Sequence, residues 1–289
     1  MAESKQERLW QACTDGDLEI VKELVDDSAV DINWVGEDRG DTPLHRACRF
    51  GWLEIVKVLL VQKKIEVNKG NKGDASPFYI ASQGGHKEVV FLLLADPRID
   101  PNKPSNTEAT PFYIACSHGH KEVVALLLAD PRIDPNKAND KGASPFLVGC
   151  QNGHKEVASL LLADPRIDPN KPYNDQSTPL WLASHHGHLV VVQLLLASTR
   201  EIDTRRRSTF KNRTAAEQGR AISARATKRA NEMEDDFQRR KTHGHLCATL
   251  IDEYERDPDG TRFRLRKELG LTGGFAESLR QKAETITRT

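Results

Sequence analysis

The sequence predicts an all-α solenoid of stacked helix-turn-helix pairs with protruding hairpin loops. One observation is a hydroxyl residue followed by proline that returns every 34 residues, at Thr42-Pro43, Ser76-Pro77, Thr110-Pro111, Ser144-Pro145 and Thr178-Pro179. A second is the segment Ala-Asp-Pro-Arg-Ile-Asp-Pro-Asn-Lys, which is identical at residues 95–103, 129–137 and 163–171. A fixed period of this length indicates a repeat protein whose modules stack on their neighbours.

The first helix of each repeat is expected to begin at the hydroxyl-proline pair. In the repeat that starts at Thr110, the threonine can cap the helix and Pro111 can fill its first turn, where the missing N–H has no cost. The helix is expected to run for about two turns. Gly119 then suits a tight reversal that needs positive φ.

The second helix of the same repeat is expected over residues 121–129. Its apolar residues lie on more than one face, as expected for a helix packed between neighbours. Pro131 ends it. Residues 130–143 are polar and extended, and we expect them to form a hairpin that protrudes from the stack.

The order of helix, glycine turn, helix and hairpin resembles the ankyrin-repeat family. The family pattern T-P-L-H-x-A is matched in full at residues 42–47, and the period of 34 is one longer than the family's usual period of about 33. The resemblance implies the ankyrin fold and a surface for binding proteins, but it leaves the partner open because this scaffold serves many functions.

The hairpin tips depart from the family pattern. Gly40 and Gly142 keep the family's glycine, whereas Asp74, Glu108 and Gln176 replace it in the other repeats. Those three hairpins either avoid positive φ or carry strain of about 1 kcal/mol each.

The repeat register divides the chain into four parts. Residues 1–33 are expected to form an atypical N-terminal capping repeat, and residues 34–203 form five regular repeats. Residues 204–255 form an interrupted C-terminal repeat with a charged helical insertion at 221–242. Residues 256–289 form a basic tail with short helices. Two alternatives stay open for this tail: it is truncated, or it docks on a partner that is absent from the sequence.

The interrupted repeat is expected to start its first helix at residues 213–217 and to turn at Gly244-His245. A second helix would follow at residues 246–254. Between them, apolar residues recur at mostly four-residue steps, which favours a helical extension of the first helix, with disorder as the alternative. These apolar residues are Ile222, Ala226, Ala230, Met233 and Phe237.

The tail has three expected elements. Residues 257–260 predict a turn, residues 261–269 a short basic helix ended by Gly270, and residues 275–286 a last helix. No apolar partner for this ending is obvious in the sequence.

Composition and charge narrow the class of protein. The net charge is zero, but residues 1–203 hold 22 basic and 29 acidic residues, whereas residues 204–289 hold 20 and 13. No apolar run approaches the roughly 18 residues of a membrane span, and the N-terminus lacks the apolar core of a signal peptide. We therefore expect an intracellular, cytoplasmic monomer, with the nucleus as the alternative location.

The cysteines are expected to be reduced core residues. Cys13, Cys48, Cys116 and Cys150 share one position of the first helix, which serine occupies in two other repeats. Small buried side chains fit this column better than disulfides do.

Histidines and aspartates recur with the repeat and do not form a site for chemistry. His86, His120, His154 and His188 follow the turn glycine, where a ring nitrogen can bond loop backbone. No Cys-x-x-Cys pair supports zinc, and equivalent aspartates on stacked modules lie about 10 Å apart, too far to share a proton. We expect no catalytic residue, no cofactor and no metal site, hence no enzyme.

Two function classes remain. The first is a scaffold that binds an unidentified protein through the concave face formed by hairpin tips and first helices. The second is binding of nucleic acid or another acidic surface through the basic C-terminal region, where residues 205–213 carry five basic side chains but one aromatic. A solvated surface is the ordinary explanation of such a charge run, and steep salt dependence of binding would favour the second class.

The candidate partner-binding residues differ from repeat to repeat while the framework around them stays the same. Aromatic residues and arginine are the preferred anchors in interfaces, although Trp181 has packing between repeats as its alternative role. The candidates are Arg49, Phe50, Lys72, Ser117, His118, Asp140, Lys141, Gln151, Asn152, Tyr173, Trp181, His185 and His186.

Overall fold

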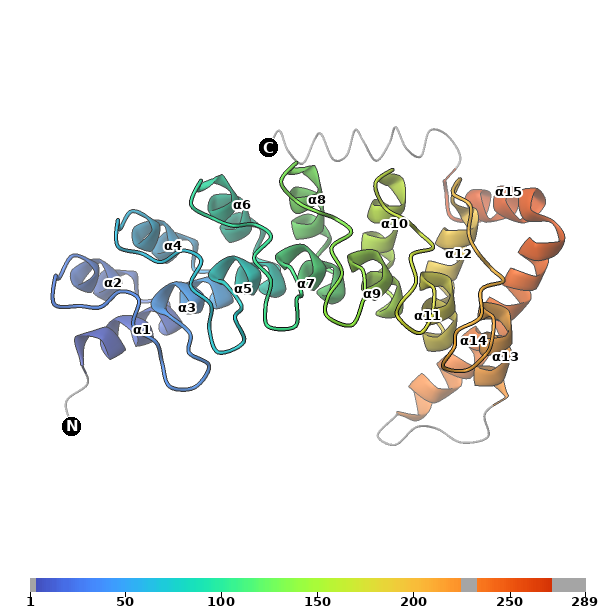
Figure 1. Cartoon of the computed structure of the whole chain (residues 1–289), viewed down its shortest axis with the longest axis horizontal. Coiled ribbons are helices and arrows are strands. Elements are labelled where there is room, and N and C mark those ends of the chain that lie inside the picture. The colour runs from blue at the N-terminus through green and yellow to red at the C-terminus, as the bar shows by residue number, and fades with distance from the viewer. Residues whose placement is uncertain (1–3, 225–232, 272–289) are drawn as a thin grey trace. The chain divides into compact units, whose positions relative to one another are not determined.

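The computed structural model describes residues 4–224 and 233–271, and the described part of the chain is all-helical apart from one isolated bridge between Ser208 and Arg213 (Figure 1). The chain divides into two compact units. The first comprises residues up to 115 together with 122–134, and the second comprises residues 116–121 together with those from 135 onward.

The first unit is a stack of helix pairs in sequence order. Helix α1 packs on α3 and α3 on α5, while α2 packs on α4 and α4 on α6, so first and second helices form separate layers. The helices are α1 (Lys5–Asp15), α2 (Leu18–Val25), α3 (Pro43–Phe50), α4 (Leu53–Leu60), α5 (Pro77–Gly84), α6 (Lys87–Ala95), α7 (Pro111–His118) and α8 (Lys121–Ala129), of which α7 and α8 cross the boundary between the units.

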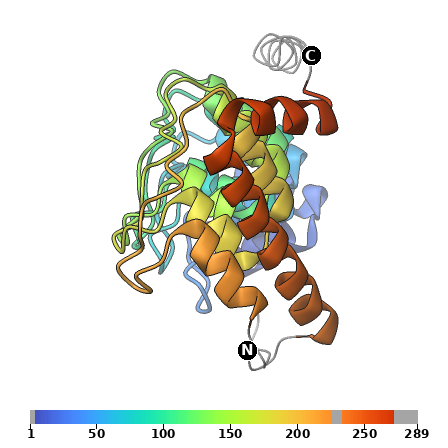
Figure 2. The same ribbon diagram turned by 90° about the vertical axis from the view of Figure 1, so that its right-hand side faces the viewer.

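The second unit repeats the arrangement and then departs from it. Helix α9 packs on α11 and α11 on α13, and α10 packs on α12. The helices are α9 (Pro145–Gln151), α10 (Lys155–Ala163), α11 (Pro179–His186), α12 (Leu189–Ala197), α13 (Ala215–Ser223), α14 (Glu234–Arg256) and α15 (Pro258–Glu268). Figure 2 shows α14 as a long helix beside the last helix pairs, with α15 turned across its C-terminal end.

The predicted helix starts are confirmed by their caps. The side chains of Thr42, Ser76, Ser144 and Thr178 each accept a hydrogen bond from the backbone N–H three residues on, and proline follows at the first helical position. The glycine turns are confirmed as well, since Gly119 has a φ of 76°. Local rules therefore account for the ends of the regular helices.

The regular hairpins close with two backbone bonds each, one across the loop and one within its tip, and contain no named strand among the described residues. In the third repeat the N–H of Asn71 donates to the carbonyl of Ala75 at 3.1 Å. Asp74, Glu108 and Gln176 all have positive φ, at 54°, 55° and 64°. The three hairpins therefore adopt positive φ, which was the second of the two alternatives. Residues other than glycine are disfavoured at positive φ, so these hairpins carry backbone strain.

Equivalent asparagines tie successive repeats together. The side-chain amide of Asn68 donates to the carbonyl of Arg98 at 2.6 Å, and its oxygen accepts from the N–H of Asp100 at 3.0 Å. Asn102 makes the same pair of bonds one repeat later, and Asn170 does so in the second unit. The repeated Asn-Lys letters thus mark a structural bond between neighbouring loops.

The repeated Asp-x-Arg pairs have a structural role too. Asp96 and Arg98 form an ion pair at 2.6 Å, and the same guanidinium donates to the carbonyl of Leu60, at the C-terminal end of α4, at 2.8 Å. A cation at that end of a helix stabilises its unsatisfied carbonyls. These aspartates are consequently framework residues of the stack.

The core consists of repeated columns of aliphatic and aromatic side chains. Phe78, Phe112 and Phe146 are almost fully buried, as are Leu93, Leu127 and Leu161. The five cysteines are buried and free, which confirms the prediction of reduced core residues. Burial raises the pKa of the Cys13 thiol, so it stays protonated and inert.

The interrupted repeat differs from the prediction. Helix α13 ends at Ser223, and α14 runs without a break from Glu234 to Arg256, so Gly244-His245 is not a turn and the helical continuation belongs to the second helix. Gly244 is required for close packing, since a Cβ there would lie 2.9 Å from the carbonyl oxygen of Gly219 on α13. Ala226 and Ala230 lie outside the described residues.

The predicted elements of the C-terminal tail are also partly wrong. Asp257 caps α15 and Pro258 begins it, so the expected turn at residues 257–260 is the first turn of a helix. Leu265 is fully buried, and α15 packs on α12 and α14, which supplies the apolar partner that the sequence did not reveal. Gly270 follows the helix with a φ of 67°, as predicted, and residues 275–286 lie outside the described residues.

Candidate partner-binding groove

A groove in the first unit lies between the hairpin tips of the second, third and fourth repeats and the first helices of the second and third repeats. It measures about 500 Å³. Its charged lining residues are Asp38, Arg39, Arg49 and Lys72, and its uncharged ones include Tyr79, Gln83 and Asn106. We call this surface the tip groove. Its tip residues come from loops that differ between repeats, and its floor comes from α3 and α5.

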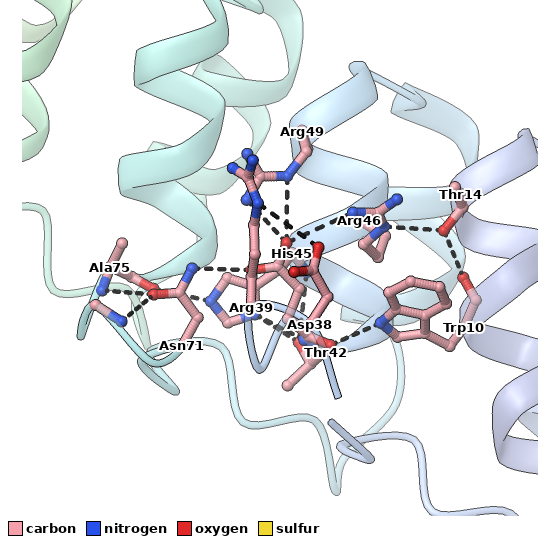
Figure 3. Close-up of polar contacts among 12 residues, drawn as sticks. Trp10, Thr14, Asp38, Arg39, Thr42, His45, Arg46, Arg49, Asn71 and Ala75 are labelled. Atoms are coloured by element: carbon pink, nitrogen blue, oxygen red, sulfur yellow. Dashed lines mark hydrogen bonds and ion pairs between the residues drawn. The ribbon is translucent and has the colours of Figure 1, made fainter. Parts of the chain in front are cut away.

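The wall of the tip groove depends on a buried carboxylate. Asp41 is 1% exposed and accepts hydrogen bonds from Arg49 Nη2 at 2.8 Å and from Asn71 Nδ2 at 2.8 Å. Its backbone carbonyl accepts from Trp10 Nε1 at 2.7 Å. Figure 3 shows the side chains of Arg49, Asn71 and Trp10 in this network. Asp41 therefore connects the first helix of its own repeat to the loop of the next repeat and to the capping repeat.

The charge of Asp41 is stabilised in place. Burial raises its pKa, but the hydrogen bonds from Asn71 and Arg49 and the positive charge of Arg49 outweigh burial, so the pKa lies below the ordinary value. Arg49 keeps 20% of its side chain exposed. Its guanidinium is thus held in one orientation at the groove with part of its surface accessible.

His45 is a neutral part of the same network. Its Nε2 lies 2.9 Å from the carbonyl oxygen of Ala75, which can only accept, so Nε2 carries the proton and Nδ1 accepts from the N–H of Thr42 at 3.1 Å. Burial lowers the pKa of His45, which keeps the ring uncharged. The histidine of the family pattern at this position therefore fixes the loop and does not face a partner.

An arginine between two aromatic rings lies on α3, three residues before the lining residue Arg49. The Arg46 guanidinium lies 4.5 Å from the ring centroid of Trp10 and 5.1 Å from that of Phe50, and its Nε donates to Thr14 Oγ1 at 2.9 Å. Phe50 is 42% exposed. Aromatic surface of this kind, held by a rigid neighbour, is the chemistry of an interface anchor.

Lys72 extends over the hairpin of the preceding repeat. Its Nζ donates to the carbonyls of Glu37 at 2.5 Å and Asp38 at 3.0 Å. Of the sequence-predicted candidates in the first unit, Arg49 and Lys72 line the tip groove, and Phe50 follows Arg49 at the end of α3. Arg39 lines the same groove, at a hairpin-tip position of the kind that the sequence analysis singled out. Arg46 was missed, although its place on the same helix as Arg49 was a usable signal.

The remaining candidates lie in the second unit. Asp140 and Lys141 are exposed at a hairpin tip, Asn152 is exposed at a helix end, and Gln151 and Tyr173 are partly exposed. The carbonyl of Ser117 accepts from the side chains of Asn152 at 2.8 Å and His154 at 2.8 Å. His118 stacks on His120 with their ring centroids 5.9 Å apart.

Trp181 is not an accessible anchor. It is 3% exposed, and its Nε1 donates to the carbonyl of Arg213 at 2.9 Å, so it packs between repeats as the alternative interpretation held. His185 stacks on Trp181 with 5.1 Å between centroids, and its Nδ1 lies 2.7 Å from Gln218 Nε2. The seventh repeat explains the burial of Trp181 and the contact of His185 with Gln218, because it covers the face that Trp181 would otherwise present to solvent.

The periodic histidines bond a neighbouring repeat. His86 Nε2 lies 2.9 Å from the carbonyl of Arg49, and His188 Nε2 lies 2.9 Å from that of Gln151. The bonded backbone belongs to the helix end of the preceding repeat and not to the histidine's own loop. In the described residues no group of three or more histidine, cysteine or acidic residues could hold a metal ion.

The basic segment at residues 205–213 is partly neutralised by its neighbours. Arg206 pairs with Asp203 at 3.1 Å, and Arg207 pairs with Glu217 at 2.7 Å. Phe210 is 67% exposed, with Lys211 Nζ 4.3 Å from its ring centroid. Two of the arginines are therefore already engaged by carboxylates, which weakens the case for a nucleic-acid surface.

Comparison with known proteins identifies the family. The family model for ankyrin repeats in three copies matches residues 9–105, 78–173 and 114–208, which together span more than half of the chain. The chain belongs to the ankyrin-repeat family. Proteins of this kind generally act as interaction modules that bind other proteins on extended surfaces.

The solved structures agree on the fold. One similar structure is the ankyrin repeat domain of Bcl-3, described as a unique member of the IkappaB protein family. It is 23% identical to this chain, has a TM-score of 0.62, and the match covers 73% of this chain and 92% of that one. No curated protein matches the chain.

Among the described residues, no helix combines the length and the apolar content that crossing a membrane requires.

Proposed function

We propose that this protein is a non-catalytic scaffold that binds a partner protein through the tip groove. The observation that carries the proposal is the groove itself, about 500 Å³ between variable loop tips and a helical floor. Phe50, which is 42% exposed, follows the lining residue Arg49 at the end of α3. The equivalent tips and helix ends of the second unit, including Asp140, Lys141, Asn152 and Tyr173, extend the candidate surface within that unit.

The charge of the tip groove suggests the chemistry of the partner. Three of its four charged lining residues are basic, and because Arg49 pairs with Asp41 at 2.8 Å and Arg39 with Asp38 at 3.8 Å, the charge in excess is that of Lys72. The partner segment is therefore proposed to carry a carboxylate. Electrostatic complementarity of this kind contributes mainly to specificity and to the rate of association.

Affinity capture with matched variants tests the proposal. The test variant carries Arg39→Ala, Phe50→Ala and Lys72→Ala, which leave the Asp41–Arg49 pair intact. The control carries Lys64→Ala and Phe91→Ala, which remove an exposed cation and an exposed ring from the same unit outside the groove. We expect the control to capture the same proteins as the native chain and the test variant to lose at least one of them.

Equal capture by the native chain and a folded test variant would contradict the tip groove as the binding surface. Arg49→Ala is avoided because it would unpair a buried carboxylate, so that a loss of binding could reflect unfolding. Repeating the capture at several salt concentrations checks the carboxylate chemistry, since binding through exposed charges weakens as salt is added.

A further inference from the structure

Two consecutive arginines stand three and two residues before a hydroxyl side chain at several positions in the part of the chain that the structure describes. The hydroxyl residues concerned are Ser208, Thr209 and Thr242. Protein kinases select substrates by such charge patterns, because acidic side chains in the substrate groove can pair with the arginines. The arginine pattern does not distinguish the candidates from one another, but their surroundings in the fold do.

Two of the candidates are protected by the fold. Ser208 is 0% exposed, and its Oγ lies 2.9 Å from Ser177 Oγ, which donates to it. Thr242 is exposed, but it lies inside α14 with helical turns on both sides. Arg240, two residues before Thr242, is only 7% exposed. A kinase could therefore bind the segment around Thr242 only after local unfolding of α14.

Thr209 lies in the exposed tip of the hairpin between α12 and α13, outside any helix. The two arginines before it, Arg206 and Arg207, keep 38% and 50% of their side-chain surface exposed. Phe210, directly after it, is 67% exposed. The tip thus presents two guanidinium groups, a hydroxyl residue and an aromatic ring together at the surface.

The two arginines already have carboxylate partners. Arg206 pairs with Asp203 at 3.1 Å, and Arg207 pairs with Glu217 at 2.7 Å. Exposed ion pairs of this kind contribute little to stability. Because a kinase groove also offers carboxylates, each arginine would exchange one carboxylate for another. The pairing therefore opposes recognition only weakly.

The hydroxyl of Thr209 has a hydrogen bond that must break before it can react. Its Oγ1 donates to the backbone carbonyl of Asp175 at 3.0 Å, and the backbone N–H of Thr209 donates to the same oxygen at 2.7 Å. Both bonds join this tip to the tip of the preceding repeat. Breaking them opens an exposed turn, whereas access to Thr242 requires opening the middle of a 23-residue helix.

We propose that Thr209 is phosphorylated by a protein kinase whose substrate groove carries acidic side chains. The Oγ1 of Thr209 attacks the γ-phosphorus of MgATP, a bond forms between them, and the bond from that phosphorus to the oxygen that bridges to the β-phosphate breaks. ADP leaves, and the hydroxyl proton passes to a carboxylate of the kinase and then to water.

The product differs from the unmodified tip in two ways. Oγ1 no longer carries a hydrogen, so its bond to the Asp175 carbonyl is lost, and the tip gains a group with strong negative charge. Phosphorylation therefore changes the surface that the last hairpin tip presents to other molecules.

Incubation of the full chain with MgATP and the catalytic subunit of cyclic-AMP-dependent protein kinase tests the proposal, because this kinase selects arginines ahead of its target. Mass spectrometry of proteolytic peptides locates the phosphate. We expect it on Thr209 and not on Ser208 or Thr242. A chain that accepts no phosphate, or that accepts it at Ser208 or Thr242 as fast as at Thr209, would overturn the proposal.

Matched variants test the acceptor and its recognition, with circular dichroism as the check that each remains folded. Thr209→Val should abolish phosphate incorporation, whereas Thr242→Val, the same change at the site inside α14, should leave its rate unchanged. Arg206→Gln should lower the rate about tenfold, the effect of losing one charge-assisted contact. Arg205→Gln removes an exposed arginine that lies outside the recognised pair, and it should have little effect. A native rate in Arg206→Gln would contradict recognition through the arginines.

Synthetic peptides separate the effect of the fold from that of the sequence. One peptide spans residues 203–214 and the other spans residues 236–247, so each carries its threonine behind two arginines. Because a short peptide lacks the packing of α14, we expect both peptides to accept phosphate. A 236–247 peptide that accepts none would show that the sequence, and not the helix, excludes Thr242, and it would overturn the structural argument for Thr209.

Discussion

Replacing Asp41 with alanine should destabilise the first unit even though alanine stands at this position in the third repeat. The carboxylate accepts from Arg49 Nη2 at 2.8 Å, from Arg49 Nε at 3.2 Å and from Asn71 Nδ2 at 2.8 Å. Asp41→Ala removes the acceptor and leaves these donors without it.

The magnitude follows from how buried the pair is. Breaking a fully buried ion pair by removing one partner costs about 3–5 kcal/mol. Arg49 keeps 20% of its side chain exposed, so water can solvate part of its charge. We therefore expect the free energy of unfolding to fall by about 2–4 kcal/mol.

The double variant Asp41→Ala, Arg49→Gln separates charge from packing. It places in the second repeat the residues that the third repeat carries at these positions, Ala75 and Gln83. The double variant removes the Arg49 guanidinium together with its carboxylate, and of the ion pairs only the longer contact of Arg46 with Asp41, at 3.7 Å, is lost without replacement. It should therefore be more stable than Asp41→Ala alone by about 1 kcal/mol or more.

Urea unfolding followed by far-ultraviolet circular dichroism measures all three proteins. The transition midpoint and slope are both recorded, since an unchanged slope shows that the same structure unfolds. A loss below about 0.5 kcal/mol for Asp41→Ala, or a double variant less stable than the single one, would refute the reasoning.

The same pair predicts a pH dependence. The pKa of Asp41 is lowered in the folded protein, so its charge stabilises the fold at neutral pH and this contribution is lost as the pH falls. The stability difference between the native chain and Asp41→Ala should therefore shrink below about pH 4, where an ordinary aspartate takes up its proton. A difference that stays constant from pH 7 to pH 3 would show that the charge is not responsible.

Three further changes probe the stack. Leu127→Ala should lower the free energy of unfolding in denaturant melts by about 2–5 kcal/mol, and Leu24→Ala should lower it less. Both side chains are buried, but the first repeat is packed from one side only. Equal losses in the two variants would contradict this reasoning. Glu108→Gly should raise the melting temperature by relieving about 1 kcal/mol of backbone strain, and an unchanged or lower value would argue against strain at its φ of 55°. Gly244→Ala should cost about 1–3 kcal/mol by forcing α14 away from Gly219, seen as faster hydrogen exchange in both helices; unaltered exchange would show that the close approach is dispensable.

The regular repeats were predictable because their signals are local. A hydroxyl before proline caps a helix through a bond that spans three residues, and Gly119 turns the chain through its own φ. The column of Leu127 repeats at every 34th residue, so the register alone showed that it is buried. Neither inference required knowledge of distant contacts.

The candidate surface was only partly predictable. The tip and helix-end positions indicated Phe50 and Lys72, but the sequence did not reveal that Arg49 is paired with a buried carboxylate or that Arg46 lies between two rings. Trp181 was ambiguous for the same reason, since its exposure depends on whether a further repeat covers it.

The sequence by itself determined the repeat, its helix ends and its buried columns, because each depends on bonds within a few residues or on an identical neighbour one period away. The tertiary structure decided the features that occur once. Gly244 lies within a helix and not in a turn because Gly219 packs against it, and Leu265 is buried because α15 folds back onto α12 and α14. Such contacts join residues far apart in the chain without repeating, so no periodicity records them.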